Sequence, residues 1–187
     1  MDLEIHKDVV AQALAGNGKA MEKLYSLYSK SMYNICCRIM NNTADAEDML
    51  QETFIEAFRR LGTFRFESTF GAWLKRIAIN KCINELRRKK VQLAYGEIPD
   101  GCDLPDEDSD DVRNDLMTVE RIRHAMALLP DGYRVVFSLY MMEGYDHDEI
   151  ASILSISPST SKTQLMRAKN KIIEILKTGD LLVPNNN

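Results

Sequence analysis

The chain has 187 residues, of which 45% are hydrophobic and 28% are charged, and its formal net charge is −4. This composition is typical of a folded globular protein and excludes a disordered chain; the length suits one domain or two small ones. There is neither an apolar run of the roughly 20 residues that a membrane span requires nor an N-terminal secretion signal. The four cysteines form no CxxC pair, so we expect a cytoplasmic protein without membrane insertion.

Charged residues are sorted into blocks along the chain. Residues 45–56 contain five acidic residues and no basic one, and residues 71–90 contain seven basic residues and one acidic residue. Residues 97–120 contain ten acidic residues and one basic residue, and residues 158–177 contain five basic residues and one acidic residue. Blocks of this kind predict several charged surfaces with different partners.

The first half of the chain shows helical periodicity. Apolar residues recur at spacings of three and four from Leu24 to Ile39, which predicts a first helix. A second helix, which Asn42 or Thr43 can cap, extends to about Leu61, and a third covers about residues 70–90. We call the second of these the acidic helix, because it carries the acidic block 45–56.

The segment 97–115 separates two helical regions. It carries two prolines, one glycine and an acidic run without an apolar stripe, which predicts a linker. The alternative, a single surface loop, is disfavoured because structureless loops beyond about 15 residues are uncommon. Downstream, the pattern predicts helices near 116–128, 132–142, 146–154 and 158–176. The predicted fold class is all-α, with two small helical domains joined by an acidic flexible linker.

The third helix and the loop before it combine aromatic, basic and amide side chains. Four aromatic residues fall within residues 64–73. Trp73 and Ile77 share a helical arc with arginines, and a purely solvated face would not carry such apolar residues. Aromatic rings stack on unpaired bases, cations bind phosphates, and asparagine bonds to base edges. The alternative is that the aromatic residues cover the core and the arginines are solvated. We call this predicted surface for single-stranded nucleic acid the aromatic–basic face: Phe64, Arg65, Trp73, Arg76, Ile77, Asn80, Asn84 and Arg87.

Residues 146–176 have the pattern of a helix-turn-helix. A short turn follows the helix 146–154, Ser157 can cap the next helix, and Pro158 suits its first position. The second helix exposes hydroxyl and basic side chains that suit phosphates and base edges in the major groove. The alternative is a helical hairpin with a solvated basic face. The candidate reading residues are Ser159, Thr160, Lys162, Thr163, Met166 and Arg167.

The acidic helix has three interpretations. Asp45, Asp48 and Glu52 lie opposite its apolar stripe, and they form a solvated face, a docking surface for a basic partner, or ligands for Mg²⁺ or Mn²⁺. The metal interpretation needs a second carboxylate pair on another helix, and no phosphate loop or nucleophile spacing accompanies it. We therefore expect no metal, no cofactor and no enzymatic activity. Of the cysteines, Cys36, Cys37 and Cys82 are expected in the core.

Two stretches of the chain resemble one family. Residues 45–90 resemble region 2 of bacterial sigma factors of the extracytoplasmic-function (ECF) group, and residues 127–172 resemble their region 4. The resemblance implies a region 2 domain at 1–94, a linker at 95–117, a region 4 domain at 118–178 and a disordered tail at 179–187. It implies a transcription initiation factor rather than an enzyme, with core RNA polymerase, promoter DNA and an anti-sigma factor as partners.

The resemblance assigns a role to each surface. The acidic helix is expected to dock on the clamp helices of the polymerase β′ subunit, through Asp45, Glu47, Asp48, Gln51 and Glu52. The aromatic–basic face is expected to bind the −10 element as a single strand and to capture a flipped base, and the second helix of the helix-turn-helix to read the −35 element. Residues 133–143 are expected to support the contact with the β flap. The acidic linker either imitates RNA in the polymerase channel or serves only as a spacer.

The chain departs from the family pattern at four positions. Phe66 and Ser155 stand where glycine is common, Ser161 stands where valine is usual, and Gln164 stands where arginine is frequent. These positions lie in or next to the elements that set the promoter sequence. A rival function is a helix-turn-helix regulator that binds duplex DNA without core polymerase. It explains residues 144–177 but leaves residues 45–90 without a role.

Overall fold

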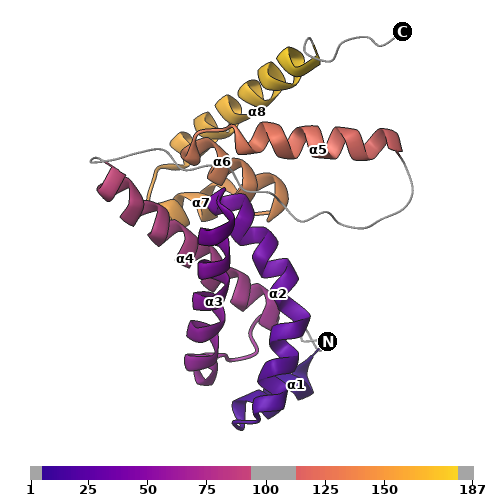
Figure 1. Cartoon of the computed structure of the whole chain (residues 1–187). Coiled ribbons are helices and arrows are strands. Elements are labelled where there is room, and N and C mark those ends of the chain that lie inside the picture. The colour runs from indigo at the N-terminus through magenta and orange to yellow at the C-terminus, as the bar shows by residue number, and fades with distance from the viewer. Residues whose placement is uncertain (1–5, 94–112, 181–187) are drawn as a thin grey trace. The chain divides into compact units, whose positions relative to one another are not determined.

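A computed structural model describes residues 6–93 and 113–180, with side chains for residues 6–90 and 119–177. Within these ranges the chain is helical and contains no strand, which confirms the all-α class. The chain divides into two compact units, Met1–Leu104 (unit 1) and Pro105–Asn187 (unit 2), whose elements are labelled in Figure 1. In the described part of the chain, every helix is too short or too polar to cross a membrane.

Unit 1 consists of four α-helices and one short 3-10 helix. They are α1 (Lys7–Leu14), α2 (Gly18–Met40), α3 (Thr43–Arg59), η1 (Leu61–Thr63) and α4 (Phe70–Leu93). Helices α2, α3 and α4 pack against one another, and α1 packs against α2. The structure confirms the three predicted helices and adds α1. The predicted cap of the acidic helix, α3, is Asn42, whose Oδ1 accepts a hydrogen bond from the backbone N–H of Asp45 at 3.0 Å.

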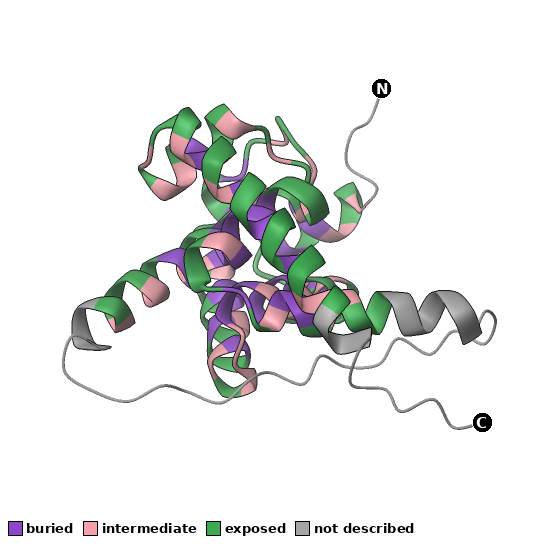
Figure 2. Cartoon of the chain, turned by 90° about the horizontal axis from the view of Figure 1, so that it is seen from above, coloured by how far each residue is buried: buried purple, intermediate pink, exposed green. Residues whose placement is uncertain are grey.

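The core of unit 1 lies where α2, α3 and α4 face one another. Figure 2 shows buried residues on the inner sides of the helices and exposed residues on their outer sides. Cys36, Cys37 and Cys82 are buried and unoxidised, which confirms the prediction of core thiols; Cys102 lies outside the described residues. A hydrogen bond with Cys36, together with burial, raises the pKa of the Cys82 thiol, so that it stays protonated at neutral pH.

Unit 2 consists of helices that pack around the long last one. They are α5 (Arg113–Ala127), α6 (Asp131–Phe137), the π-helical turn η2 (Ser138–Met142), α7 (His147–Leu154) and α8 (Pro158–Asp180). Helix α8 packs against α5, α6 and α7. The helix predicted near 132–142 is therefore an α-helix followed by a π turn, in which the N–H of Glu143 donates to the Ser138 carbonyl five residues back at 3.1 Å.

The predicted linker at 95–117 falls mostly outside the described residues. Its last residues are an exception, because α5 already begins at Arg113. The predicted linker range therefore overlaps the first residues of α5. The predicted tail at 179–187 begins inside α8, which ends at Asp180, and the rest of it lies outside the described residues.

Three described residues other than glycine have positive φ angles: Asn41, Phe66 and Ser155. Two of them, Phe66 (φ 57°) and Ser155 (φ 55°), stand at the positions where the family resemblance leads one to expect glycine. A side chain in this left-handed region costs about 1–2 kcal/mol relative to ordinary backbone. The backbone therefore keeps the conformation that glycine favours even though the side chain has changed.

We expect Ser155→Gly to stabilise unit 2 by about 1 kcal/mol, because Ser155 ends α7 in the left-handed conformation and its side chain is exposed. The measurement is the thermal unfolding of the chain, followed by calorimetry. Ser152→Gly is the matched control, since Ser152 is exposed within α7 and its replacement should destabilise the helix by about 0.5 kcal/mol. Equal effects of the two changes would mean that the backbone at Ser155 carries no strain.

Candidate functional site

The aromatic residues of the aromatic–basic face form one cluster around Phe64. Its ring centroid lies 4.8 Å from that of Phe66, 5.4 Å from Trp73 and 5.9 Å from Phe70. Phe70 is fully buried, while Phe66 and Trp73 are half-buried. The cluster therefore anchors the loop 64–70 to the beginning of α4 and leaves Phe66 and Trp73 partly exposed to solvent.

The polar residues predicted for this face are exposed, but two apolar ones are not. Arg65, Arg76, Asn80, Asn84 and Arg87 are all exposed.

In contrast, Phe64 is 6% exposed and Ile77 is 9% exposed. Ile77, which shares an arc with the arginines of the aromatic–basic face, is therefore buried beneath that face. Helix α4 packs against both α2 and α3, so its buried face is wider than a single apolar stripe.

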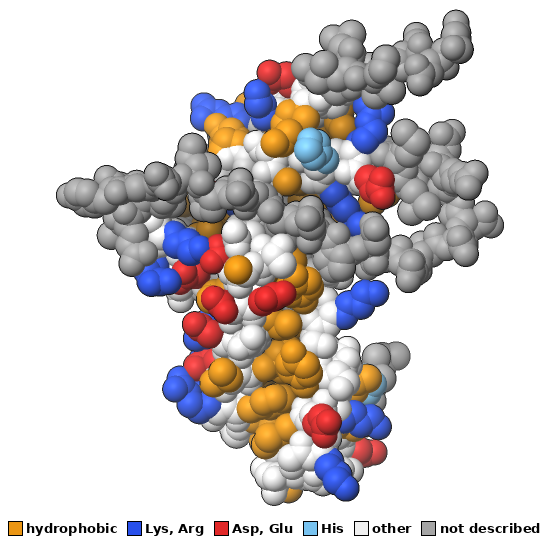
Figure 3. Space-filling view, in the orientation of Figure 1, with side chains coloured by type: hydrophobic (Ala, Val, Ile, Leu, Met, Phe, Trp, Pro, Cys, Tyr) orange, Lys and Arg blue, Asp and Glu red, His pale blue; other side chains and the backbone are white. Residues whose placement is uncertain are grey.

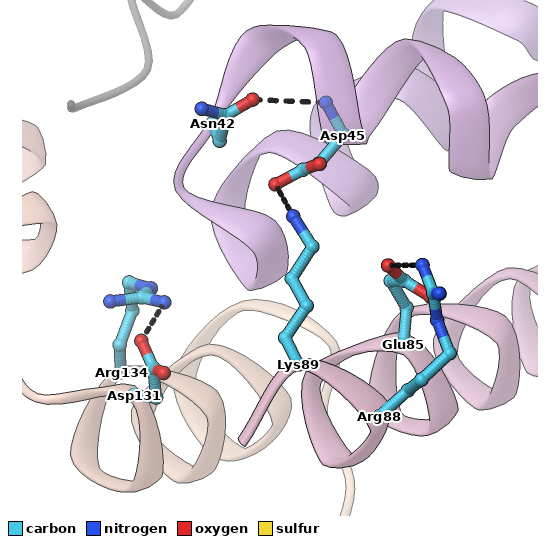
Figure 4. A network of polar contacts seen from close by, with 7 residues as sticks. All are labelled: Asn42, Asp45, Glu85, Arg88, Lys89, Asp131 and Arg134. Carbon is cyan, nitrogen blue, oxygen red and sulfur yellow. Dashed lines mark hydrogen bonds and ion pairs between the residues drawn. The ribbon is translucent and has the colours of Figure 1, made fainter. Parts of the chain in front are cut away.

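Several of the basic residues of α4 already have acidic partners. The Nζ of Lys81 lies 3.1 Å from Oε2 of Glu52 on α3. Lys89 forms an ion pair with Asp45, which is also on α3 (Figure 4). Arg88 makes two hydrogen bonds to Glu85, at 2.7 and 2.6 Å, which lower the pKa of that carboxyl. Much of the positive charge that the sequence places on α4 is thus neutralised within unit 1.

The acidic helix α3 presents its docking candidates in two different environments. Glu47, Asp48 and Gln51 are exposed. Asp45 is held between the Asn42 cap and Lys89, as Figure 4 shows, and Glu52 is paired with Lys81.

An apolar patch lies beside these acids. Ile55 is 66% exposed, and Tyr25 of α2 is exposed with its ring 4.7 Å from that of Phe54. Figure 3 shows a band of hydrophobic side chains over α2 and α3, with acidic side chains beside its upper end. Ile55 was not among the predicted docking residues, although at 100° per residue it falls between Asp48 and Gln51 on the acidic face, and that placement was the available signal.

The metal interpretation of α3 would require converging ligands. Within residues 6–90 and 119–177, no three His, Cys, Asp or Glu side chains lie close enough together to hold a metal ion. The carboxylates of Asp45 and Glu52 face lysines of α4 instead. In the described part of the chain, a solvated face and a docking surface for a basic partner are the two interpretations that fit α3.

The predicted helix-turn-helix consists of α7 and α8. The capping box of Asp146 and Glu149 begins α7, and Ser157 caps α8 by accepting a hydrogen bond from the N–H of Thr160 at 3.1 Å. Thr163 donates its hydroxyl to the Ser159 carbonyl at 2.9 Å. Except for Thr160, which is half-buried, the candidate reading residues are exposed: Ser159, Lys162, Thr163, Met166 and Arg167.

A part-buried hydrogen bond joins the two helices. Ser161 is fully buried on α8, and its Oγ lies 2.9 Å from Nδ1 of His147 on α7. The ring of His147 in turn stacks on Tyr140 of η2, with centroids 4.7 Å apart. A polar contact at Ser161 thus joins α8 to α7.

The segment expected to support the β-flap contact is mostly buried. Val135, Val136, Phe137 and Leu139 belong to the core of unit 2. The exposed apolar side chains are those of η2: Tyr140, Met141 and Met142. The π turn places these three side chains on the surface while the preceding helix stays in the core.

Comparison with known proteins identifies the family of the chain. Residues 24–91 match the sigma-70 region 2 family, and residues 119–172 match the family of sigma-70 region 4. The ECF RNA polymerase sigma factor SigW of Bacillus subtilis is 30% identical over 190 residues, which cover 95% of this chain and 99% of that protein. The chain belongs to the ECF sigma factors.

Further relatives agree with this assignment. The RNA polymerase sigma-H factor of Pseudomonas aeruginosa is 28% identical over 189 residues, covering 93% of this sigma factor and 95% of that one. Among solved structures, the sigma factor RpoE from Bartonella quintana, in complex with the anti-sigma factor NepR, covers 85% of this chain and 98% of that chain with a TM-score of 0.62 and 21% identity. CnrH, in complex with the cytosolic domain of CnrY, covers 91% of this chain and 96% of that chain with a TM-score of 0.55 and 24% identity. These structures share the fold.

In this ECF sigma factor, the residues matched to region 2 lie in unit 1, and those matched to region 4 lie in unit 2. The protein is a transcription initiation factor of RNA polymerase, and the family of sigma factors is not one of catalytic enzymes.

Proposed function

We propose that this sigma factor binds core RNA polymerase through α3, holds the −10 element as a single strand on α4, and reads the −35 element with α8. The observation that supports the proposal most is that one chain exposes two different surfaces, one with aromatic and amide side chains on α4 and the loop before it and one with hydroxyl and basic side chains on α8. The rival regulator of duplex DNA needs only the second surface. We place the protein in the cytoplasm, where polymerase and chromosome are found.

The docking surface combines exposed acids with an apolar centre. Asp48 and Gln51 lie on either side of the highly exposed Ile55 on α3. Protein interfaces commonly bury an apolar centre inside a polar rim, and complementary charge steers the encounter. A basic partner surface with its own apolar group, as we propose for the clamp helices of the β′ subunit, fits this arrangement.

Strand opening follows from differential binding to the unpaired strand. Extruding a base from the duplex costs a few kcal/mol, and each base stacked on an aromatic side chain recovers about 1–3 kcal/mol. Phe66 and Trp73 are partly exposed at the surface, and Asn80 and Asn84 offer amide groups for base edges. Phe64 and Ile77 support this surface from beneath.

In unit 2, we propose that α8 enters the major groove with its exposed N-terminal half. Lys162 and Arg167 provide cations for phosphates and guanines, and Met166 provides an apolar group for thymine methyls. The apolar residues of η2 then remain for the β flap. An anti-sigma factor is a further proposed partner, because the RpoE structure that shares this fold is a complex with one.

Promoter-selective run-off transcription tests the function. Purified core polymerase with the full chain should yield a defined transcript from a promoter selected by the holoenzyme, and none from a template with scrambled −10 and −35 elements. Core polymerase should also co-purify with the chain. A chain that binds duplex DNA but neither retains core polymerase nor directs transcription would instead be the regulator of the rival interpretation.

Arg167→Ala should weaken binding to the preferred −35 duplex by about 1–3 kcal/mol and relax discrimination at one base pair, because arginine commonly makes two hydrogen bonds to a guanine edge. The measurement is duplex affinity on matched and scrambled −35 sequences, with Lys171→Ala, at an exposed site further along α8, as the control. Equal losses on both sequences would show that Arg167 contacts only phosphate.

A further inference from the structure

We propose that Lys81 is a further contact of this sigma factor to promoter DNA, and that Glu52 holds Lys81 in the free chain until a basic partner surface takes over Glu52. Lys81 was not among the residues predicted for the −10 interface. The inference rests on the proposed function, in which α3 docks on polymerase and α4 binds the −10 strand.

Lys81 lies at the border between the two surfaces. It follows the exposed Asn80 directly and precedes the exposed Asn84 by three residues, which places it on a neighbouring part of the α4 surface. Its Nζ lies 3.1 Å from Oε2 of Glu52, one of the docking candidates of α3. A single ion pair thus connects the edge of the DNA surface to the edge of the docking surface.

The exposure of this pair makes it exchangeable. The side chains of Lys81 and Glu52 are 31% and 53% exposed, so that water and competing charges reach both. Exposed ion pairs are weak, and an incoming basic group or phosphate can replace either partner.

The neighbouring pair of Lys89 and Asp45 differs. Its side chains are only 27% and 21% exposed, and Asp45 is tied to the Asn42 cap, as Figure 4 shows. We therefore infer that the Lys89–Asp45 pair holds α4 on α3, and that the Lys81–Glu52 pair is the one whose partners are replaced by polymerase and DNA.

The exchange links docking to DNA binding. When Glu52 pairs with a basic group of the polymerase, Lys81 is released to pair with a phosphate, so that one ion pair breaks and two form. Because each binding event removes the competitor of the other, the coupling is reciprocal. The free chain then binds DNA less well than the same chain within the holoenzyme.

The first part of the test uses the free full-length chain and a short fluorescent single-stranded DNA of mixed sequence. Glu52→Gln should raise the affinity for this DNA about 2- to 5-fold above the effect of Asp48→Asn. Asp48 is the matched control, since it lies one turn earlier on α3, loses the same charge and makes no ion pair with a lysine in the part of the chain that the structure describes. Lys81→Gln in the Glu52→Gln background should abolish the gain.

The second part uses the holoenzyme at saturating core polymerase and a single-stranded −10 oligonucleotide. Lys81→Gln should lower its affinity about 2- to 5-fold and reduce the slope of log affinity against log salt by about 0.7, the value for one phosphate contact to single-stranded DNA. Lys23→Gln, at an exposed lysine of α2, controls for the loss of charge. Circular dichroism confirms that the variants remain folded, since an exposed pair contributes little to stability.

Two results would overturn the inference. Equal gains for Glu52→Gln and Asp48→Asn would reduce the effect to net charge, and an unchanged salt slope for Lys81→Gln in the holoenzyme would remove Lys81 from the DNA contacts. Failure of the proposed function is recognised separately. In that case the wild-type holoenzyme binds promoter and scrambled strands equally, whereas the comparison of Glu52→Gln with Asp48→Asn still measures the ion pair.

Discussion

Asp48→Lys should weaken the binding of the chain to core RNA polymerase by about 2 kcal/mol or more, roughly 30-fold in affinity. Asp48 is exposed on α3 next to the apolar Ile55, so its reversal places a like charge against a basic partner without disturbing the core. The melting temperature of unit 1 should stay unchanged. The measurement is a titration of labelled core polymerase at several salt concentrations, in which the loss should shrink as salt increases.

Two further variants separate docking from folding. Glu22→Lys reverses an exposed charge on α2 and should leave polymerase affinity near the wild-type value. Asp45→Lys places a cation opposite Lys89 and at the N-terminus of α3, so it should lower the thermal stability of unit 1 as well. If Glu22→Lys weakens polymerase binding as much as Asp48→Lys, the effect is one of net charge and α3 is not the docking surface.

Phe64→Ala should destabilise unit 1 by about 3–5 kcal/mol, because it removes the central ring of the aromatic cluster at a buried site. Since domains typically have only about 5–15 kcal/mol of stability, unit 1 should unfold at a clearly lower temperature. Calorimetry of the full chain measures this change. The transition of unit 2 serves as the internal reference.

The comparison with Phe66→Ala decides what Phe64 does. Phe66 is half-buried, and its positive φ angle already strains the backbone, so its truncation should cost much less stability. If Phe64→Ala instead leaves unfolding unchanged but abolishes binding of the −10 strand, Phe64 contacts the flipped base directly. That outcome would restore the role that the family resemblance implies, in place of the supporting role that its burial indicates.

The sequence by itself determined most of the helices and the caps of α3 and α8. The caps at Asn42 and Ser157 and the periodicity of α2, α3 and α4 depend on residues within a few positions of one another, and the structure confirms them. The two positions where the family resemblance leads one to expect glycine also indicated the local backbone conformation, because Phe66 and Ser155 both have a positive φ angle.

Only the tertiary structure decided which surfaces remain available for partners. The pairs Lys89–Asp45 and Lys81–Glu52 join residues 44 and 29 positions apart, and no local sequence pattern predicts them. Periodicity locates the centre of an apolar face but not its width, which depends on how many neighbouring helices cover it. For this reason Ile77, on a helix with two neighbours, is buried, whereas Ile55 lies exposed among acids on α3.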